Sequence, residues 1–419
     1  SMGHAFGPTE ERGVLRTRDG GKTWERVLFQ NELTGAIDLV MSPGDPNVLF
    51  AALWTFERKA WGSFFGGPDG GIWRSRDGGD SWEEITTNPG LPEGDTGRIG
   101  LTMSAADPDR VYALVDSATQ TGLYRSDDLG ENWSFVTADA NITARPFYFT
   151  HIYANPSNAD ELWSPANKLW RSVDAGKTWI LEPSAKDDFQ DIWIDPQDPM
   201  RMIATCDGGT AVTLTGGKSW SSFANQSGVQ FYRVDTDDQF PYRVYGNAQD
   251  LLTYSIPSSS RWGGIPLHMT DFIGNGETGR AIPRPGDPNI VYGLSTGATF
   301  GAATQFTVNN LKTGQTEPRP VWPEILFGTP ASEFKYRFNW QAPFLVSPHD
   351  PNTIYFAGNV VFRSRDEGMT WEKISDDLTH NLTDKMKVAG SEWLPEYFGQ
   401  ETFSTIHRLE ESPHEEGVL

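Results

Sequence analysis

One eight-residue pattern recurs along this chain and constrains its fold more than any other feature. The pattern is Ser or Thr, any residue, Asp, any residue, Gly, any two residues and Trp, and it reads SRDGGDSW at residues 75–82. A decayed copy at residues 213–220 has Thr215 in place of the aspartate. The other intact copies lie at residues 17–24, 126–133, 172–179 and 364–371. Five intact copies predict a chain built from structural repeats.

Each octet is typical of a tight turn between two antiparallel strands. A short acidic side chain such as Asp77 accepts hydrogen bonds from the backbone amides of its own turn. Gly79 supplies the positive φ that the turn needs. Trp82 starts the next strand and packs over the hairpin as a large apolar contribution at one fixed position per repeat. The octet therefore predicts a structural element.

A second pattern precedes most of the octets. An alternating apolar strand leads into a turn that contains Asp-Pro, and another apolar strand follows. Copies begin at Ala36, Arg98, Asp191, Arg280 and Ala342. With the two strands that flank each octet, this gives four strands per repeat at a spacing of roughly 40 to 60 residues, the size of a propeller blade. We therefore expect an all-β fold, and within it a β-propeller.

The repeats predict seven four-stranded blades, and the two ends of the chain predict one more. Residues 11–29 are typical of the last two strands of a blade, and residues 403–419 of the first two. Pairing of these two segments would close an eight-bladed ring in which the termini share one blade and no sheet edge is exposed. The alternative is seven blades with two frayed ends, and either arrangement makes residues 1–419 a single propeller domain. The seven complete blades are expected at residues 35–88, 97–139, 147–184, 189–226, 231–269, 278–325 and 338–378.

Composition limits the classes of partner. The chain has 419 residues, with 56 acidic and 34 basic side chains and a formal charge of −22. A nucleic acid would be repelled over most of such a surface, so we expect no nucleic-acid partner. Cys206 is the only cysteine, which excludes an internal disulfide. No apolar run approaches the roughly 20 residues of a membrane span, and no signal peptide is recognisable.

The repeats and the phrases between them resemble a bacterial family of BNR or Asp-box proteins, which are glycosyl hydrolase-like and related in fold to sortilin ectodomains and tandem-propeller xyloglucanases. The resemblance covers essentially the whole chain. It implies a secreted or periplasmic location, and a longer parent protein with further propeller blades. The matching phrases are GHAFGPTEERGV from Gly3, TGAIDLVM from Thr34, GRIGL from Gly97, QFYRVDTDDQFPYRVYG from Gln230 and KYRFNWQAPFLVSPHDPNTIY from Lys335.

A propeller gathers polar side chains at one rim of its central channel. The first strand of each blade starts at that rim and the second strand ends there, so residues at these positions converge. Carboxylates there are candidates for a glycosidase acid and base, of which one is held protonated by burial or by a neighbour. The candidate catalytic residues are Asp116, Asp207, Asp250 and Glu277. The alternative for each is ordinary turn chemistry.

The resemblance favours two of these carboxylates. In tandem-propeller xyloglucanases the catalytic aspartates follow a second strand and precede a Gly-rich turn. Asp207, before Gly208 and Gly209, is similar in placement, and Asp116 is so more loosely. Asp207 and Asp116 would lie on two blades of one ring, whereas the xyloglucanase pair lies across two propellers.

Other polar and aromatic residues near the rim are candidates for ligand binding. Trp54 and Trp61 belong to an aromatic insertion that either stacks on sugar rings or packs against a neighbouring domain. The candidate ligand-binding residues are Arg98, Tyr232, Arg337, Asn339, Trp54 and Trp61, and further approaches to first strands carry Arg145, His151 and Asp191.

Two departures from the family pattern weaken the prediction of catalysis. Where relatives tend to have D-H-H-D before the fourth blade, this chain has DFQD at residues 188–191. Where relatives have Q-Q-D-N-G, it has AQDLL at residues 248–252. A sialidase is also disfavoured. The chain has enough arginines for the three that bind a carboxylate in that family, but the family's F/Y-R-I-P start is missing.

Three functional hypotheses follow. The first is a carbohydrate-directed, glycoside hydrolase-like propeller that acts on a polysaccharide or oligosaccharide. Its acid and base would be Asp116 and Asp207, and Arg98 would be an orienting cation. The second is a non-catalytic binding propeller, similar to the sortilin ectodomain, which predicts scattered carboxylates and an exposed apolar patch at residues 54–65. The third is a calcium-dependent hydrolase of phosphoesters or lactones, with Ca²⁺ held by channel-facing oxygens. Otherwise no metal or cofactor is expected.

Overall fold

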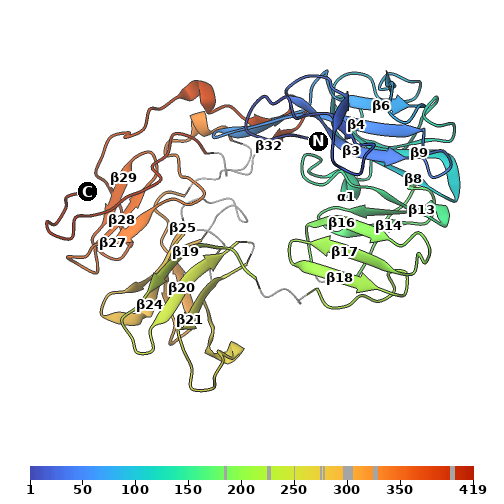
Figure 1. Cartoon of the computed structure of the whole chain (residues 1–419). Coiled ribbons are helices and arrows are strands. Elements are labelled where there is room, and N and C mark those ends of the chain that lie inside the picture. The colour runs from blue at the N-terminus through green and yellow to red at the C-terminus, as the bar shows by residue number, and fades with distance from the viewer. Residues whose placement is uncertain are drawn as a thin grey trace. The chain divides into compact units, whose positions relative to one another are not determined.

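The computed structural model describes residues 1–183, 186–223, 228–249, 251–273, 276, 279–295, 305–323, 329–396 and 402–419. The chain divides into two compact units. Unit 1 comprises Ser1–Lys59, Ser63–Ser227 and Gly390–Pro395, and unit 2 comprises Ala60–Gly62, Gly228–Ala389 and Glu396–Leu419. Strands dominate both units, which confirms the all-β class (Figure 1). The expectation of a single propeller domain stays a prediction.

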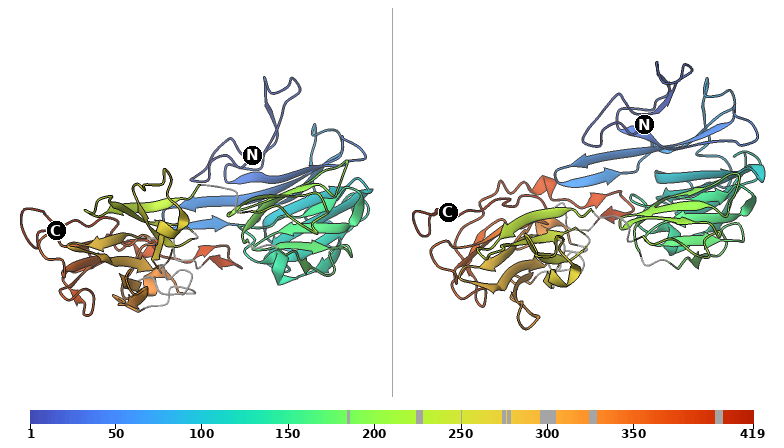
Figure 2. Two further views of the ribbon diagram at one scale, coloured as in Figure 1. Left: turned by 90° about the horizontal axis from the view of Figure 1, so that it is seen from below. Right: turned by 60° about the horizontal axis from the view of Figure 1, so that its bottom comes forward.

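Unit 1 contains successive antiparallel sheets in the order of the chain (Figures 1 and 2). The first is the pair β1 (Val14–Arg16) and β2 (Glu25–Leu28). Four strands of the first complete blade are β3 (Thr34–Met41), β4 (Leu49–Lys59), β6 (Gly71–Ser75) and β7 (Glu83–Glu84). The second blade has β8 (Thr96–Ser104), β9 (Asp107–Ser117), β10 (Gly122–Ser126) and β11 (Ser134–Thr137). The short helix α1 (Ala140–Thr143) precedes the third, which has β12 (Tyr153–Asn155), β13 (Asn158–Pro165), β14 (Leu169–Ser172) and β15 (Ile180–Leu181). The fourth has β16 (Phe189–Ile194), β17 (Met202–Cys206) and β18 (Gly209–Thr213).

Unit 2 contains three more four-stranded sheets. They are β19 (Phe231–Thr236), β20 (Arg243–Ala248), β21 (Thr253–Pro257) and β22 (Asp271–Ile273), then β23 (Ala281–Arg284), β24 (Asp287–Ser295), β25 (Gln305–Asn310) and β26 (Gln315–Pro318), and finally β27 (Phe344–Val346), β28 (Ile354–Ala357), β29 (Val361–Ser364) and β30 (Glu372–Lys373). Short 3-10 turns lie at Leu267–Met269, Ala331–Glu333 and Thr383–Lys385. Within the described ranges no helix has the length and hydropathy that a membrane span requires.

These repeated four-stranded meanders are propeller blades, as the sequence predicts. The fourth sheet differs from expectation, because its fourth strand is missing from the described residues. At that edge the Ser221 N–H donates to the Val212 carbonyl at 2.9 Å, and the Val212 N–H donates to the Ser221 hydroxyl at 3.0 Å. The two strands expected in residues 403–419 are also wrong. That segment has no strand and packs Ile406 and Leu409 onto the apolar face of β27 to β29. The closure of an eight-bladed ring by a shared blade, or seven blades, stays a prediction.

The aromatic insertion after the first blade's second strand is a strand extension. β4 continues to Lys59, and β5 (Gly62–Phe65) follows it in the same sheet. β31 (Ala389–Gly390) pairs with β5 in parallel, with Gly390 opposite Phe64, and β32 (Pro395–Glu396) borders β31. A segment that is distant in sequence therefore joins the sheet of the first blade.

The apolar core lies between successive sheets. Between the first and second blades, Phe50, Ile72, Ile99, Val111 and Trp133 form one cluster, and each is at most 5% exposed. Equivalent clusters lie between later pairs of blades in each unit. The middle strands β6 and β28 are buried on both faces, whereas the outer strands β7, β15, β26 and β30 are exposed.

The octets form the turns that the sequence predicts. In the octet at residues 75–82, Asp77 accepts a hydrogen bond from the Ser81 backbone N–H at 2.9 Å, and the Gly79 N–H donates to the Ser75 hydroxyl at 2.8 Å. Gly79 has a φ of +87°. Hydrogen bonds from Ser81 and Ser75 lower the pKa of Asp77 to about 2. In the other intact octets, Asp19, Asp128, Asp174 and Asp366 each accept the backbone N–H four residues later at 2.9 Å.

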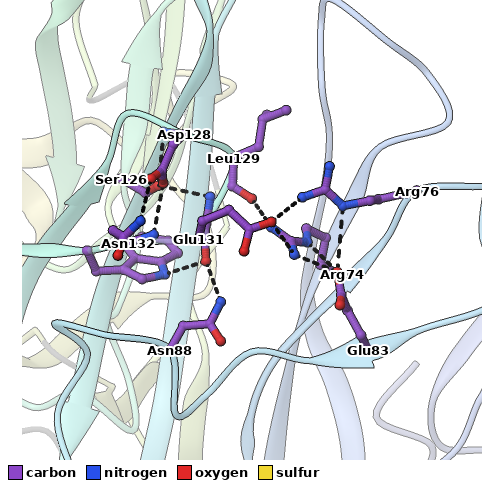
Figure 3. A network of polar contacts seen from close by, with 11 residues as sticks. Arg74, Arg76, Glu83, Asn88, Ser126, Asp128, Leu129, Glu131 and Asn132 are labelled. Carbon is purple, nitrogen blue, oxygen red and sulfur yellow. Dashed lines mark hydrogen bonds and ion pairs between the residues drawn. The ribbon is translucent and has the colours of Figure 1, made fainter.

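Arginines tie one blade to the octet of the next. Arg74, at the end of β6, is 3% exposed and donates to the Leu129 carbonyl at 2.5 Å in the octet of the second blade (Figure 3). It also contacts Glu131 of that octet at 3.0 Å and Glu83 of its own blade at 2.6 Å. In the same way, Arg16 on β1 bonds to the Gly78 carbonyl and to Asp80, each at 2.7 Å.

Candidate functional site

Five polar side chains lie on or beside the first strands of the four blades of unit 1. We call them the inner-strand cluster. Two of them, Asp38 and Tyr153, were not among the candidates from the sequence. The members are Asp38 on β3, Arg98 on β8, His151 just before β12, Tyr153 on β12 and Asp191 on β16.

Arg98 is the centre of this cluster. It lies at a register shift between Thr96 and Ile99, where β8 departs from regular pairing with β9. Its guanidinium donates to the Phe147 carbonyl at 3.2 Å and the Tyr148 carbonyl at 3.1 Å, and its other terminal nitrogen lies 3.1 Å from His151 Nε2. The bulge thus turns a cationic side chain from the second blade toward the approach to the third.

His151 is neutral in this setting. Burial, and then the positive charge of Arg98, lower the pKa of His151 to about 4. Since a guanidinium only donates, Nε2 of His151 accepts the hydrogen bond from Arg98 and the ring proton resides on Nδ1. Burial also lowers the pKa of Arg98, although the nearby charge of Asp38 opposes this.

Asp38 links the first two blades. One of its carboxyl oxygens accepts the Leu101 N–H of β8 and the other accepts the Leu39 N–H, each at 2.8 Å. Burial raises the pKa of Asp38 and the charge of Asp191 raises it further, against the lowering effect of the two hydrogen bonds and of Arg98. Asp38 is half-buried.

Tyr153 and Asp191 complete the cluster. Burial, and then the interaction with the Asp191 side chain, raise the pKa of Tyr153. Asp191 is exposed, whereas Tyr153 is half-buried. The inner-strand cluster thus contains one exposed and one half-buried acidic side chain, and acidic side chains are the groups that glycosidic bond cleavage uses.

Asp116 lies in a separate, buried position at the end of β9. Its exposed fraction is 2%, and its Oδ1 accepts hydrogen bonds from Trp393 Nε1 at 3.0 Å and from the Thr121 hydroxyl at 3.3 Å. Its Oδ2 is buried without a partner in the described structure. Gly97 lies directly over it, since a Cβ there would be 1.9 Å from Oδ2. Burial raises the pKa of Asp116.

Asp207 is in a different setting. It is exposed, in the two-residue hairpin turn from β17 to β18, and its N–H donates to the Asp188 carbonyl at 3.2 Å. Asp207 and Lys186 both act electrostatically on Cys206. Asp250 and Glu277, the other two candidate carboxylates, lie outside the described residues.

The unit 2 candidates have structural contacts. Arg337 is 6% exposed and forms an ion pair with Asp377 at 2.7 Å, to which Asn359 also donates at 2.9 Å. Asn339 caps a turn by accepting the Gln341 N–H at 3.1 Å. Tyr232 accepts a hydrogen bond from Trp340 Nε1 at 3.4 Å. Arg337 and Asn339 thus have hydrogen-bond partners within the protein, and their role in ligand binding stays a prediction.

The aromatic insertion is largely buried. Trp54 is 5% exposed and packs against Phe56 and Phe65, with the Arg98 guanidinium 5.7 Å from its ring centre. Trp61 is half-buried against Phe403, with the Lys385 ammonium 4.7 Å from its ring centre. The exposed apolar patch expected at residues 54–65 is therefore wrong, because the strand extension turns these rings inward.

Metal binding has no support in the described part of the chain, where no group of three or more His, Cys, Asp or Glu side chains is arranged to hold an ion. The calcium hypothesis stays a prediction.

Two curated relatives were found, and no protein-family model matches the chain. A xyloglucanase of Paenibacillus sp is 24% identical over 326 residues, which are 73% of this chain and 29% of the relative. A probable oligoxyloglucan-reducing end-specific xyloglucanase of Neosartorya fischeri is 21% identical over 315 residues, 70% of this chain and 36% of the relative. The chain thus spans about a third of the length of these relatives.

Solved structures that are similar to this chain include GH74 enzymes and the protein YCF48. The GH74 enzyme of Niastella koreensis has a TM-score of 0.33 at 12% identity and covers 83% of this chain and 68% of its own. An ancestral GH74 enzyme has a TM-score of 0.39 at 14% identity, with 87% and 52% covered. YCF48 bound to D1 peptide has a TM-score of 0.30 at 12% identity, with 81% and 84% covered. At such TM-scores these likenesses do not bear on the arrangement of the site.

Proposed function

We propose that this chain is part of a carbohydrate-directed, glycoside hydrolase-like propeller, with a polysaccharide of the xyloglucan class as its substrate. The observation that carries the proposal is the similarity to the Paenibacillus xyloglucanase over 326 residues. The inner-strand cluster supports it, because that cluster offers hydrogen-bond donors, acceptors and carboxyl groups of the kind that bind and cleave sugars.

The finer parts of the proposal rest on the sequence. The five intact octets and the decayed copy favour an Asp-box protein of the BNR type. A secreted or periplasmic location is proposed with it, since a polysaccharide substrate lies outside the cytoplasm.

A non-catalytic binding propeller, similar to the sortilin ectodomain, is the second candidate. The specific observation in its favour is Asp116, because this candidate acid is 2% exposed under Trp393 and cannot touch a substrate in that position.

The test compares binding with turnover. Xyloglucan oligosaccharides are titrated into the purified chain by calorimetry, and the release of reducing ends is followed in parallel, with cello-oligosaccharides and a polyuronate as controls. Binding that is selective for xyloglucan supports the carbohydrate-directed proposal, and turnover supports the hydrolase. Selective binding without turnover favours the binding propeller, and no binding to any of the glycans contradicts both.

A further inference from the structure

The buried carboxyl group of Asp116 lies under a short surface segment that is distant in sequence. We call this segment, residues 391–395, the strap, and both it and Asp116 belong to unit 1. Trp393 of the strap is half-buried, and its Nε1 donates to Asp116 Oδ1 at 3.0 Å. Asp116 is 2% exposed, and its Oδ2 has no partner in the described structure. The indole of Trp393 thus helps to cover a carboxyl group whose hydrogen bonding is incomplete.

Glycines line the place where the indole meets the carboxyl group. A Cβ at Gly66 would lie 2.5 Å from Cη2 of the Trp393 ring, and a Cβ at Gly97 would lie 1.9 Å from Asp116 Oδ2. Gly66 has a φ of +80°, which favours glycine in any case, but Gly97 is not in the left-handed region. At position 97 the close approach of the Asp116 side chain therefore explains the glycine.

A second buried polar group borders the same glycines. The Thr96 hydroxyl is buried without a partner in the described structure, and a Cβ at Gly70 would lie 3.0 Å from it. The Thr96 carbonyl accepts the Gly67 N–H at 3.1 Å and would lie 3.4 Å from a Cβ at Gly66. Because Gly66 also contacts the Trp393 ring, Thr96 is a neighbour of that ring and brings a second oxygen without a partner to this place.

Much of the hydrogen bonding of the strap is internal. The Ser391 N–H donates to the Leu394 carbonyl at 3.0 Å, and the Leu394 N–H donates to the Ser391 hydroxyl at 2.9 Å. Gly390, directly before the strap, pairs with Phe64 of β5 at a single register position. A segment of this kind can lift from the surface as a unit without breaking a ladder of strand hydrogen bonds.

We propose that the strap is a displaceable cover of Asp116 and that the Trp393 indole occupies the place of one sugar ring of the substrate. This inference rests on the proposed function, because the sugar belongs to the polysaccharide named there. The indole is a flat apolar ring with one N–H donor at its edge, and a pyranose likewise has an apolar face and hydroxyl donors at its edge. When the strap lifts, a sugar hydroxyl donates to Asp116 in place of Trp393 Nε1. Further hydroxyls of the sugar then offer partners to Asp116 Oδ2 and to the Thr96 hydroxyl.

The cover itself is tested by chemical labelling without any glycan. Wild type and Trp393→Ala are treated with a water-soluble carbodiimide and an amine, and the labelled carboxyl groups are located by mass spectrometry. Asp116 is expected to react at least about tenfold faster in Trp393→Ala, because the open state rises from a minor population to the main one. Asp109, an exposed carboxylate near the opposite end of β9, is the control and is expected to react equally in both proteins. Equal labelling of Asp116 in the two proteins would overturn the cover.

The place of the sugar is tested by calorimetry with a xyloglucan oligosaccharide. If the indole competes with the sugar, Trp393→Ala binds about tenfold more tightly than wild type. Trp393→Phe, which keeps a ring but loses the N–H donor, is expected to lie between the two. An affinity that is unchanged or weaker in Trp393→Ala would contradict the competition, since Trp393 would then be a bystander or a part of the binding surface. Thermal unfolding midpoints check that each variant is folded.

A measurement on the wild-type sequence decides the question even if Trp393→Ala does not fold. The protein is labelled with fluorinated tryptophan, and the fluorine NMR signal of Trp393 is assigned as the one that Trp393→Phe lacks. Saturation with the xyloglucan oligosaccharide is expected to move this signal to the position of a solvent-exposed tryptophan. A Trp393 signal that stays in place while the sugar binds overturns the inference and leaves the proposed function standing.

Failure of the proposed function gives a different result. If neither wild type nor Trp393→Ala binds xyloglucan, the proposed function is wrong and the sugar site at Asp116 is wrong with it. The labelling of Asp116 then still decides whether the strap is a displaceable cover.

Discussion

A buried carboxyl oxygen without a partner is costly when it carries charge, and Asp116 has such an oxygen. The raised pKa of Asp116 is the expected response, because protonation removes the charge. Trp393 Nε1 still donates to Oδ1 when the group is protonated, so the contact between these two residues does not require an ionised carboxylate.

Asp116→Asn tests the protonation of Asp116. Since the folded-state pKa is raised above the unfolded value, wild type loses stability as pH rises from about 4 through the folded-state pKa. Asn cannot ionise, so the variant is expected to be more stable relative to wild type at pH 7 than at pH 4. Urea midpoints at both pH values give the comparison, with Asp109→Asn as the control. Equal differences at pH 4 and pH 7 would contradict a shifted pKa.

Some site residues were predictable from sequence and others were not. Arg98, His151 and Asp191 were candidates because they precede or begin first strands, and the structure places them in one cluster. Asp38 was not among the candidates, because a single acidic residue in the apolar run AIDLVM is typical of an ordinary strand. The Asp38 carboxyl group is held by the Leu101 N–H of a different blade, and a local sequence pattern does not predict such a contact.

At the scale of the element, the octet does more than close a hairpin. In the octets at residues 75–82 and 126–133, the fourth residue presents a backbone carbonyl, and the sixth residue presents a carboxylate, to an arginine of the preceding sheet. In the octet at residues 172–179 the sixth residue is Lys177, and Arg125 of the preceding blade pairs with Asp127 of its own blade at 2.6 Å. In the octet at residues 364–371 the sixth residue is Met369, yet Arg319 of the preceding blade still donates to the Glu367 carbonyl at 2.7 Å. The contact to the carbonyl therefore does not require an acidic sixth residue. Sequence reasoning predicted the turn but missed the tie, because the tie joins residues about 55 positions apart.

Arg74→Met tests the tie between the first and second blades. The substitution keeps most of the apolar stem but leaves the Leu129 carbonyl without its donor, so we expect a loss of about 1 to 3 kcal/mol in the free energy of unfolding. Arg76→Met is the matched control. It removes a contact to the same Glu131 from an arginine that is 49% exposed, and we expect it to change stability by less than about 1 kcal/mol. Similar effects of the two variants, measured by urea unfolding, would refute the tie.

At the scale of the whole molecule, the octets give the chain a common response to acid. Hydrogen bonds from Thr23 lower the pKa of Asp19 to about 2, and those from Ser81 and Ser75 do the same for Asp77. The three other octet aspartates have lowered pKa values too, although burial opposes the effect of their hydrogen bonds. A depressed carboxyl pKa contributes stability that is present above the unfolded value and is lost as pH falls to the folded value.

We therefore expect the stability of the protein to fall between about pH 4 and pH 2. Urea midpoints at pH 2, 3 and 4 measure the slope, and Asp77→Asn is expected to flatten it because one of the responding groups is removed. A slope that Asp77→Asn leaves unchanged would show that other carboxylates cause the loss.

The blade repeat and its turns were predictable from sequence at this scale, since the octet is local. The conformation of residues 403–419 was not predictable from sequence. Apolar residues in a strand-like pattern also pack well as an extended segment that covers a sheet.

The decayed octet at residues 213–220 shows how much drift this turn tolerates. The Thr215 hydroxyl accepts the Ser219 N–H at 3.0 Å, and the Thr213 hydroxyl accepts the Gly217 N–H at 3.2 Å, so the loop closes without an acid. The turn is therefore encoded redundantly, by the glycine and by any short acceptor two residues before it. Replacement of the aspartate by threonine therefore preserves the closed loop. A blade of this kind therefore keeps its turn after its octet has lost the pattern by which sequence analysis recognises it.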